Sequence, residues 1–181
     1  MRWINQGWSS PLLDGFFSFI TEMKNFEIPI IFLILYLMIK GGEKGRWVVG
    51  TMLLCVLVTD QTASHLIKPL FERVRPCNAL PDILTPHGKS PAFSFPSSHA
   101  TNMGGSMLLL GLAYRPWMGV TLGVALLVGI SRIYLGLHYP SDVLFGWIWG
   151  AFIGWRLWVG MENLRRIKNH KIKPQRKTKK T

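Results

Sequence analysis

The chain has 181 residues, of which 49% are hydrophobic and 17% charged, and its mean hydropathy is +0.23. These values are high for a soluble domain, and the length is that of a single domain. The 21 Lys and Arg residues outnumber the 9 Asp and Glu residues, so the formal net charge is +12. A basic balance fits either nucleic acid or an anionic membrane surface. The long apolar runs favour the membrane, and no nucleic-acid partner is predicted.

The first 25 residues combine apolar and polar side chains. Residues 11–23 have the pattern of an amphipathic helix lying in the membrane interface, with Trp3 and Trp8 as interfacial anchors. The same segment could instead form a short additional span. Residues 28–39 are apolar apart from Tyr36 and predict a short transmembrane helix.

Four further helices are predicted after a turn at residues 40–46, where paired glycines break the helix. They cover residues 47–68, 99–114, 117–137 and 142–161. The proline-rich segment 69–98 excludes a continuous helix and is predicted to be a loop. The fold is therefore predicted to be all-α, an integral membrane helix bundle of five to six transmembrane helices.

The last predicted span carries Gly146, Gly150 and Gly154 at four-residue spacing. Small residues at this spacing lie on one helical face and let two helix backbones approach closely in lipid. We interpret them as a packing surface for a neighbouring helix.

Residues 1–164 are predicted to form one membrane-embedded domain, and residues 165–181 a basic tail. Alternating spans place the 40–46 turn, Arg115 and the tail on one membrane face, and the 69–98 loop on the other. Because cytoplasmic segments are enriched in Lys and Arg, the tail side is predicted to be cytoplasmic and to contact anionic lipid. The loop side would then face the periplasm or cell exterior of a bacterial cytoplasmic (inner) membrane.

One face of the 47–68 helix is polar. Asp60, Ser64 and Lys68 follow one another at four-residue spacing and therefore share a side of the helix. Polar groups at membrane depth must face protein or water, so this side is predicted to look into a cavity. Whether Asp60 supports a site or only pairs between helices stays open.

The first of three polar motifs begins at the end of this helix. Lys68 ends a span and Arg75 lies seven residues later, with Pro69 and Pro76 restricting the backbone. Two fixed cations at a membrane surface suit phosphate oxygens, and Arg can bind two oxygens at once. Snorkelling of both side chains to the interface is the simpler interpretation. Arg73, on the same loop, is given no chemical role.

The second motif is Pro96, Ser97, Ser98 and His99 at the start of a helix. Serine at this position is a helix cap, which is the structural interpretation. Helix N-termini also bind anions through free backbone N–H groups. His99 lies in the first turn, where its imidazole could transfer a proton to or from a bound group.

The third motif joins Arg132, His138 and Asp142. Arg132 lies within a span, where an unpaired cation is costly. Pro140 favours a helix start, so Asp142 falls in the first turn of the last helix. A carboxylate there could accept one imidazole N–H of His138 and free the other nitrogen for attack. The alternative is a capping Asp, a structural His and a buried ion pair, and purely structural roles for all three motifs would have to coincide on one membrane face.

These motifs resemble those of the type 2 phosphatidic acid phosphatase (PAP2) superfamily. The three are Lys68-x6-Arg75-Pro76, Pro96-Ser97-Ser98-His99 and Ser131-Arg132-x5-His138-x3-Asp142. The resemblance covers the second to the last span and reproduces all three spacings. The second motif of the family usually reads Pro-Ser-Gly-His, so Ser98 is a departure. Its backbone N–H survives the change, and altered packing around the phosphate is expected, without loss of activity.

The resemblance implies a division of roles. His138 would be the nucleophile that forms a phosphohistidine, and Asp142 would orient it. His99 would protonate the leaving oxygen and later activate water. The residues implied to hold the phosphoryl oxygens are Lys68, Arg75, Ser97, Ser98 and Arg132. Phosphoryl transfer depends mainly on positioning and charge stabilisation, which fits such a set. No carboxylate cluster accompanies the motifs, so neither a metal nor another cofactor is predicted.

The leading hypothesis is a membrane phosphatase acting on a phosphorylated or diphosphorylated lipid. Undecaprenyl diphosphate is favoured as substrate, with phosphatidylglycerol phosphate and the 1-phosphate of lipid A as the other candidates. Vanadium-dependent haloperoxidases share the motif set by resemblance, but they are soluble. A non-catalytic protein that binds or transports lipid phosphate is the alternative from another class, although it would not need both histidines. The oligomeric state is not predicted.

Overall fold

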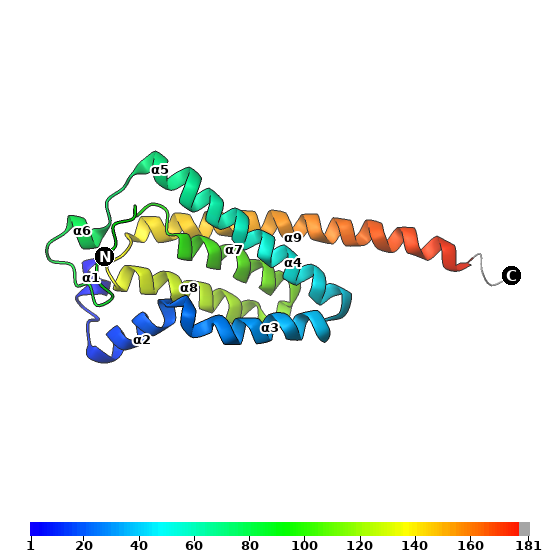
Figure 1. Cartoon of the computed structure of the whole chain (residues 1–181), viewed down its shortest axis with the longest axis horizontal. Helices are drawn as coiled ribbons and strands as arrows, with labels where there is room; N and C mark the ends of the chain where they lie inside the picture. The colour runs from blue at the N-terminus through cyan, green and yellow to red at the C-terminus, as the bar shows by residue number, and fades with distance from the viewer. Residues whose placement is uncertain (178–181) are drawn as a thin grey trace.

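Five long helices run side by side, and the polar loops gather at one end of the bundle, which we call the loop end (Figure 1). The structure is a computed structural model that describes the backbone of residues 1–177 and the side chains of residues 1–170. Within that part of the chain all regular secondary structure is helical, which confirms the predicted fold class. The long helices are α3 (Glu27–Ile39), α4 (Gly42–Asp60), α7 (Ser98–Ala113), α8 (Met118–Tyr134) and α9 (Pro140–Lys177). The short ones are α1 (Arg2–Asn5), α2 (Pro11–Thr21), α5 (Lys68–Phe71) and α6 (Pro76–Ala79), with 3₁₀ turns at Met23–Phe26 and Arg115–Trp117 and a π-helix at Gln61–Ile67.

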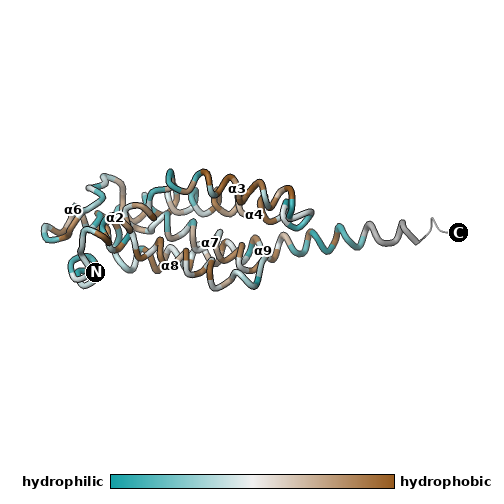
Figure 2. Tube along the Cα trace, turned by 90° about the horizontal axis from the view of Figure 1, so that it is seen from below, coloured by the Kyte–Doolittle hydropathy of each residue, from teal (hydrophilic) through white to brown (hydrophobic). Residues whose placement is uncertain are grey.

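Three helical runs are long and apolar enough to cross a membrane, namely Gly42–Ala79, Arg115–Tyr134 and Pro140–His170. The 13-residue α3 and the 16-residue α7 lie beside them. At 1.5 Å per residue these two helices are about 20 and 24 Å long, shorter than the hydrocarbon core of about 30 Å. Hydrophobic residues predominate along α3, α4 and α8, whereas the loop end and the protruding part of α9 are more hydrophilic (Figure 2). The protein is a multi-pass membrane helix bundle.

The N-terminal segment packs at the loop end and does not form another long helix. α2 has 11 residues and is about 16 Å long, which is shorter than the hydrocarbon core of about 30 Å; its interfacial position stays a prediction. Its cap is Ser10, whose Oγ accepts a hydrogen bond of 3.3 Å from Leu13 N. Phe17 is buried on α8, with its ring centre 4.4 Å from that of Tyr134.

The connection between α3 and α4 is shorter than the predicted turn at residues 40–46. Only Lys40 and Gly41 separate the two helices, and the residues that follow form the first turn of α4. Gly42 reverses the chain with a φ of 59°, a left-handed value that glycine adopts without strain. Gly45 lies against the backbone of Leu37. Glycine at that position therefore permits close helix contact and does not break α4.

The helix that begins with α4 continues beyond Lys68, so the predicted start of the loop at Pro69 was wrong. The π-helix joins α4 to α5 without a break. Pro69 cannot donate a backbone hydrogen bond, and its ring crowds the carbonyl four residues earlier. The wider π turn directly before it accommodates this conflict. The helix ends at Glu72, which takes a left-handed φ of 43°.

α7 and α9 pack closely, as the glycine spacing predicted. A Cβ at Gly150 would collide with the carbonyl of Thr101, and one at Gly154 with that of Gly105. Backbones can approach to this distance only where side chains are absent. The core beside this contact is shared by three helices and includes Val48, Leu109 and Ile153.

α9 extends well beyond the other helices (Figure 1). It passes the predicted domain boundary at residue 164 as one continuous helix. Two ion pairs involve this part of it, between Arg165 and Glu162 at 2.6 Å and between Lys168 and Glu43 at 2.8 Å. Of the predicted tail, residues 178–181 lie outside the described residues.

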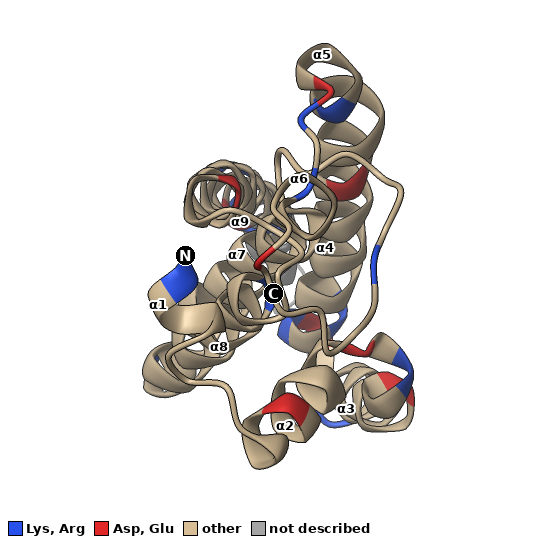
Figure 3. Ribbon diagram, turned by 90° about the vertical axis from the view of Figure 1, so that its left-hand side faces the viewer, with Lys and Arg blue, Asp and Glu red and all other residues tan. Residues whose placement is uncertain are grey.

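The connections between helices fall at two opposite ends of the bundle (Figure 1). The α3–α4 and α7–α8 turns share one end with the protruding part of α9. The α5–α7 loop and the α8–α9 turn share the other end, which Figure 3 views end-on. The chain path therefore places the three polar motifs together at the loop end.

Candidate active site

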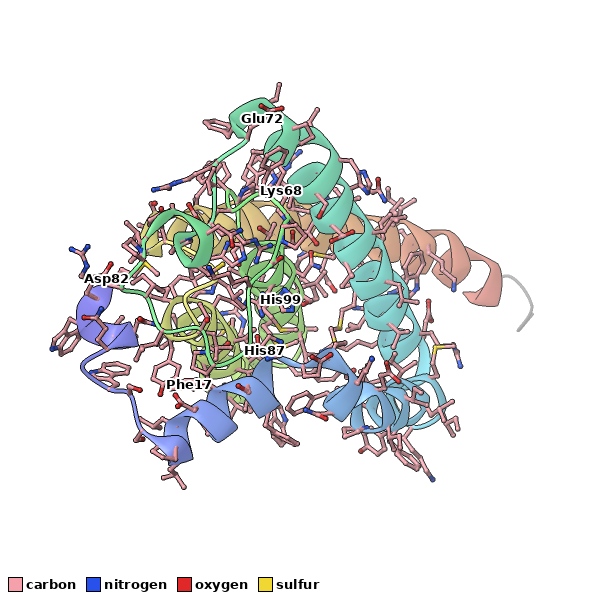
Figure 4. The ribbon with its side chains drawn as sticks, turned by 60° about the vertical axis from the view of Figure 1, so that its left-hand side comes forward. Phe17, Lys68, Glu72, Asp82, His87 and His99 are labelled. Atoms are coloured by element: carbon pink, nitrogen blue, oxygen red, sulfur yellow. The ribbon has the colours of Figure 1, made fainter. Side chains whose placement is uncertain are left out.

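Side chains from the three motifs converge at the loop end. Figure 4 shows two of them, Lys68 from α5 and His99 from the first turn of α7. The groups that act electrostatically on the His99 imidazole are Arg132, His138, Lys68 and Arg75. The fold thus brings together residues that are up to 70 positions apart, between Lys68 and His138.

His138 is buried in the turn between α8 and α9, with 1% of its surface exposed. Its Nδ1 lies 2.7 Å from the carbonyl oxygen of Ser94. A carbonyl oxygen can only accept a hydrogen bond, so Nδ1 carries the proton and Nε2 keeps its lone pair. The backbone therefore sets the tautomer, and Nε2 is the nitrogen available for attack on an electrophile.

Asp142 does not contact His138 in the way the sequence predicted. Its Oδ2 is 3.8 Å from His138 Nδ1, which is beyond a hydrogen bond. Oδ2 instead accepts hydrogen bonds from Ser94 Oγ at 2.5 Å and from Tyr139 N at 2.9 Å. The bond to Tyr139 is the return bond of a helix-capping arrangement, which draws the carboxylate to the start of α9. Asp142 thus fixes Ser94, and the Ser94 carbonyl fixes the imidazole.

Arg73 is a further partner of Asp142, and the sequence analysis assigned it no role. Its Nη1 donates to Asp142 Oδ1 at 2.7 Å and to Ser141 Oγ at 2.9 Å. Its guanidinium also lies 3.9 Å from the centre of the Tyr139 ring. Because Asp142 is fully buried, this ion pair offsets the cost of burying its charge. The sequence feature that could have indicated a role for Arg73 is its two-residue spacing from Arg75, since alternate residues of an extended segment share a side.

Arg132 is a buried cation, only 7% exposed. None of the ion pairs among the described residues involves it. Its Nη1 donates to Thr21 Oγ1 of α2 at 2.6 Å, while its Nε has no hydrogen-bond partner in the described part of the chain. An uncompensated guanidinium is costly to bury. This position is therefore suited to an anionic ligand.

Arg75 is held in place by the loop that carries it. It is 6% exposed, and its Nε donates to the carbonyl of Ala92 at 2.7 Å. Two residues later, Cys77 N donates to the carbonyl of Gly136 at 3.0 Å, which ties α6 to the α8–α9 turn. These bonds fix the guanidinium next to the His138 turn and leave its Nη groups for a ligand.

The polar side of the α4–α5 helix contacts the start of α7, and the cavity that its spacing predicted stays a prediction. Lys68 Nζ donates to Ser98 Oγ at 2.7 Å. Ser98 Oγ lies 3.1 Å from Ser64 Oγ, which in turn is 3.3 Å from Asp60 Oδ1. The hydroxyl that distinguishes Ser98 from the usual family glycine therefore holds the ammonium group of the first motif.

Ser97 and His99 occupy the N-terminus of α7. Ser97 is fully buried and caps the helix, with its Oγ accepting from Ala100 N at 3.4 Å. Its own N–H donates to the carbonyl of Asp142 at 3.1 Å, which joins the second and third motifs. The next N–H groups, of Ser98 and His99, open the helix and have no acceptor within it. This end of α7 therefore adds partial positive charge to the site.

The electrostatics of the site favour a neutral imidazole and a bound anion. Burial lowers the pKa of His138, which lies between two spans, to about 4. The Asp142 carboxylate partly opposes this effect, while Arg75 and Arg132 reinforce it. Arg75 from the first motif and Arg132 from the third are thus placed to pair with phosphate oxygens. The described residues contain no group of three or more His, Cys, Asp or Glu side chains that could hold a metal ion.

The chain resembles known proteins over most of its length. A family model described as the PAP2 superfamily matches residues 45–166. The chain is 34% identical over 156 residues to a lipid A 4'-phosphatase of Porphyromonas gingivalis, which covers 82% of this chain and 66% of that protein. It is 30% identical over 158 residues to an undecaprenyl-diphosphatase of Sulfolobus acidocaldarius, covering 86% of this chain and 74% of that one. The fold is similar to the solved structure of a transmembrane PAP2 type phosphatidylglycerolphosphate phosphatase from Bacillus subtilis. The TM-score is 0.69 and the sequence identity 25%, and the match covers 88% of this chain and 83% of that chain.

Proposed function

Because the chain belongs to the PAP2 superfamily, we propose that it hydrolyses a phosphomonoester or diphosphate carried by a membrane lipid. The reaction would take place at the loop end, on a phosphate group held among Lys68, Arg75 and Arg132. The observation that carries this proposal is the contact between His138 Nδ1 and the Ser94 carbonyl, which leaves Nε2 unprotonated. A protein that only binds lipid phosphate would have no use for a nucleophile prepared in this way.

In the first step, the lone pair of His138 Nε2 forms a bond to phosphorus while the bond from phosphorus to the leaving oxygen breaks. His99 begins the step as the imidazolium and donates its proton to that oxygen, so the lipid leaves as a neutral alcohol or as a lipid phosphate. The negative charge on the three equatorial oxygens is stabilised by the cations and by the N-terminal N–H groups of α7. Asp142 acts through Ser94 to hold the imidazole.

In the second step, His99 accepts a proton from water, and the water oxygen forms a bond to phosphorus. The bond between His138 Nε2 and phosphorus breaks, inorganic phosphate is released and both histidines return to their starting states. These two steps need no metal ion, since fixed cations and helix N–H groups stabilise the charge that Mg²⁺ stabilises in many other phosphotransfer enzymes. Metal-independent turnover is therefore part of the proposal.

The substrate is proposed to be a lipid whose phosphate reaches the loop end while its chains stay in the bilayer. The chain covers 66% of the length of the lipid A 4'-phosphatase and 74% of the undecaprenyl-diphosphatase. These relatives make a phosphorylated glycolipid and a polyprenyl diphosphate the two classes to test first. Undecaprenyl diphosphate remains the prediction of the sequence analysis. By the distribution of Lys and Arg, the loop end would face the periplasm or cell exterior.

The test is phosphate release by the purified full-length protein in detergent with EDTA. Lipid A, undecaprenyl diphosphate and phosphatidylglycerol phosphate would be offered separately at equal concentration. We expect release from one of them that EDTA does not reduce and that His138→Ala abolishes. His87→Ala, which changes a histidine of the same loop end outside the site, is the matched control and should leave release unchanged. Release that survives in His138→Ala, or no release from any lipid by folded protein, would refute the proposed function.

A further inference from the structure

A second site lies at the opposite end of the bundle from the candidate active site. A groove of about 590 Å³ runs between α4 and α9, and we call it the α4–α9 groove. Most of its lining residues are apolar or basic. The apolar ones include Trp47, Leu54, Leu157 and Leu164, and the basic ones are Arg46, Arg156 and Lys168. A groove with apolar walls and several cations suits an amphiphile with a negative charge.

Arg156 is a cation within the last helical run, towards the end opposite the candidate active site. It is about 24 Å along α9 from Pro140, within a helical run that is apolar enough to cross a membrane of about 30 Å. It is exposed on the bundle surface. Among the described side chains it makes no ion pair or hydrogen bond, and the ring centre of the adjacent Trp155 is 5.8 Å from its guanidinium carbon. Ionisable residues in such positions are usually functional.

Charge in the groove is not balanced by the protein itself. Glu43 is its only acidic lining residue, and Glu43 is already paired with Lys168 at 2.8 Å. Arg46, like Arg156, makes no ion pair or side-chain hydrogen bond within the described part of the chain. Two guanidinium groups are therefore left for a ligand, and each guanidinium can bind two phosphate oxygens at once.

Two glycines in the groove are not explained by helix packing. A Cβ at Gly50 or at Gly160 would meet no atom within 4 Å, in contrast to Gly150 in the α7–α9 contact. A glycine within a helix is less favourable than an alanine. Their shared feature is that both line the groove, where the absence of a side chain keeps it open.

We propose that the α4–α9 groove binds one anionic phospholipid from the surrounding leaflet. Its phosphate pairs with Arg46 and Arg156, and its acyl chains lie on the apolar wall formed by Leu54 and Leu157. Basic pockets between transmembrane helices bind lipid headgroups in this manner. Because the groove lies at the other end of the bundle, this site is separate from the phosphate site of the proposed reaction and does not depend on it.

The test measures the thermal unfolding midpoint, Tm, of the full chain in a non-ionic detergent. The probes are dioleoyl-phosphatidylglycerol, which is anionic, and dioleoyl-phosphatidylcholine, which is zwitterionic. A ligand that binds only folded protein raises Tm with concentration. We expect the anionic lipid to raise the wild-type Tm, and the apparent affinity to fall at least tenfold in the Arg46→Gln/Arg156→Gln variant. Gly160→Trp, which fills the groove without changing charge, should abolish the effect.

Two controls separate lipid binding in the groove from lipid binding elsewhere on the bundle. Arg115→Gln removes an exposed cation from the same end of the bundle outside the groove, and it should keep the full response. Lys68→Gln perturbs the candidate active site and should keep it as well. An equal response in wild type and Arg46→Gln/Arg156→Gln would mean that the arginines only snorkel, and would overturn the proposal. So would an equal effect of phosphatidylcholine, loss of the response in Lys68→Gln, or a dimer that Gly160→Trp dissociates.

Discussion

Replacing Ser94 with alanine removes one hydroxyl group and distinguishes two ways in which Asp142 can serve His138. The hydroxyl donates to Asp142 Oδ2 at 2.5 Å, whereas Oδ2 is 3.8 Å from His138 Nδ1. If the carboxylate acts through Ser94, then Ser94→Ala releases the segment whose carbonyl orients the imidazole. If it acts directly, the variant should turn over normally.

The size of the effect follows from the bond that is lost. A buried hydrogen bond to a charged group contributes about 1.5–3 kcal/mol, and each 1.36 kcal/mol corresponds to a factor of ten in rate. We therefore expect kcat to fall roughly tenfold to a hundredfold. KM should change little, because Lys68, Arg75 and Arg132 keep their positions. The measurement is steady-state phosphate release over a range of lipid concentrations.

Two comparisons sharpen the result. Ser106→Ala removes another buried hydroxyl, which donates to the carbonyl of Asn102 far along α7, and it should leave kcat unchanged. The double variant Ser94→Ala/Asp142→Asn should be scarcely slower than Asp142→Asn alone, since residues that act as one unit are not additive. Normal kcat in Ser94→Ala beside a severe loss in Asp142→Asn would refute the indirect arrangement.

Three more predictions concern protonation, packing and the departure from the family motif. The pKa of His138 is lowered to about 4 from an ordinary 6.5, so the folded protein binds fewer protons than the unfolded chain between these values. The free energy of unfolding should therefore decline as pH falls from about 6.5 towards 4. The loss of kcat/KM on the acidic side of its pH profile should have its midpoint well below pH 6.5. A midpoint near 6.5 would contradict the buried neutral imidazole. Gly150→Ala should lower the free energy of unfolding by about 1–3 kcal/mol because its methyl group meets the Thr101 carbonyl, whereas Gly160→Ala should not. Equal Tm values for these two variants would contradict the close packing of α7 on α9. Ser98→Gly removes the hydroxyl that holds Lys68 Nζ at 2.7 Å and should lower kcat/KM roughly tenfold without abolishing turnover, and an unchanged kcat/KM would show that Lys68 is held by other means.

Most of the fold could be predicted because its signals are local. Hydropathy and helix length identified five aligned helices, and the spacing of Gly150 and Gly154 identified the face of α9 that packs on α7. The errors occurred where a helix accommodated a residue that usually ends one. Pro69 stays helical because a π-helix precedes it, and Gly45 lies within α4 because it packs against α3. Both outcomes depend on neighbouring backbone that no single-residue preference describes.

By itself, the sequence determined the all-helical membrane class and the three motifs, and it supplied the set of residues that we propose to hold a phosphate. Motif spacing and helical period are properties of short segments, so they can be read without the fold. Only the tertiary structure decided which side chains pair with one another through hydrogen bonds and ion pairs. Arg73 and Ser94 reach Asp142 across 69 and 48 positions of chain, and the two sides of the α4–α9 groove are lined by residues more than 100 positions apart. Such contacts depend on the path of the loops and on the shape left between packed helices, and neither leaves a periodic signal in the sequence.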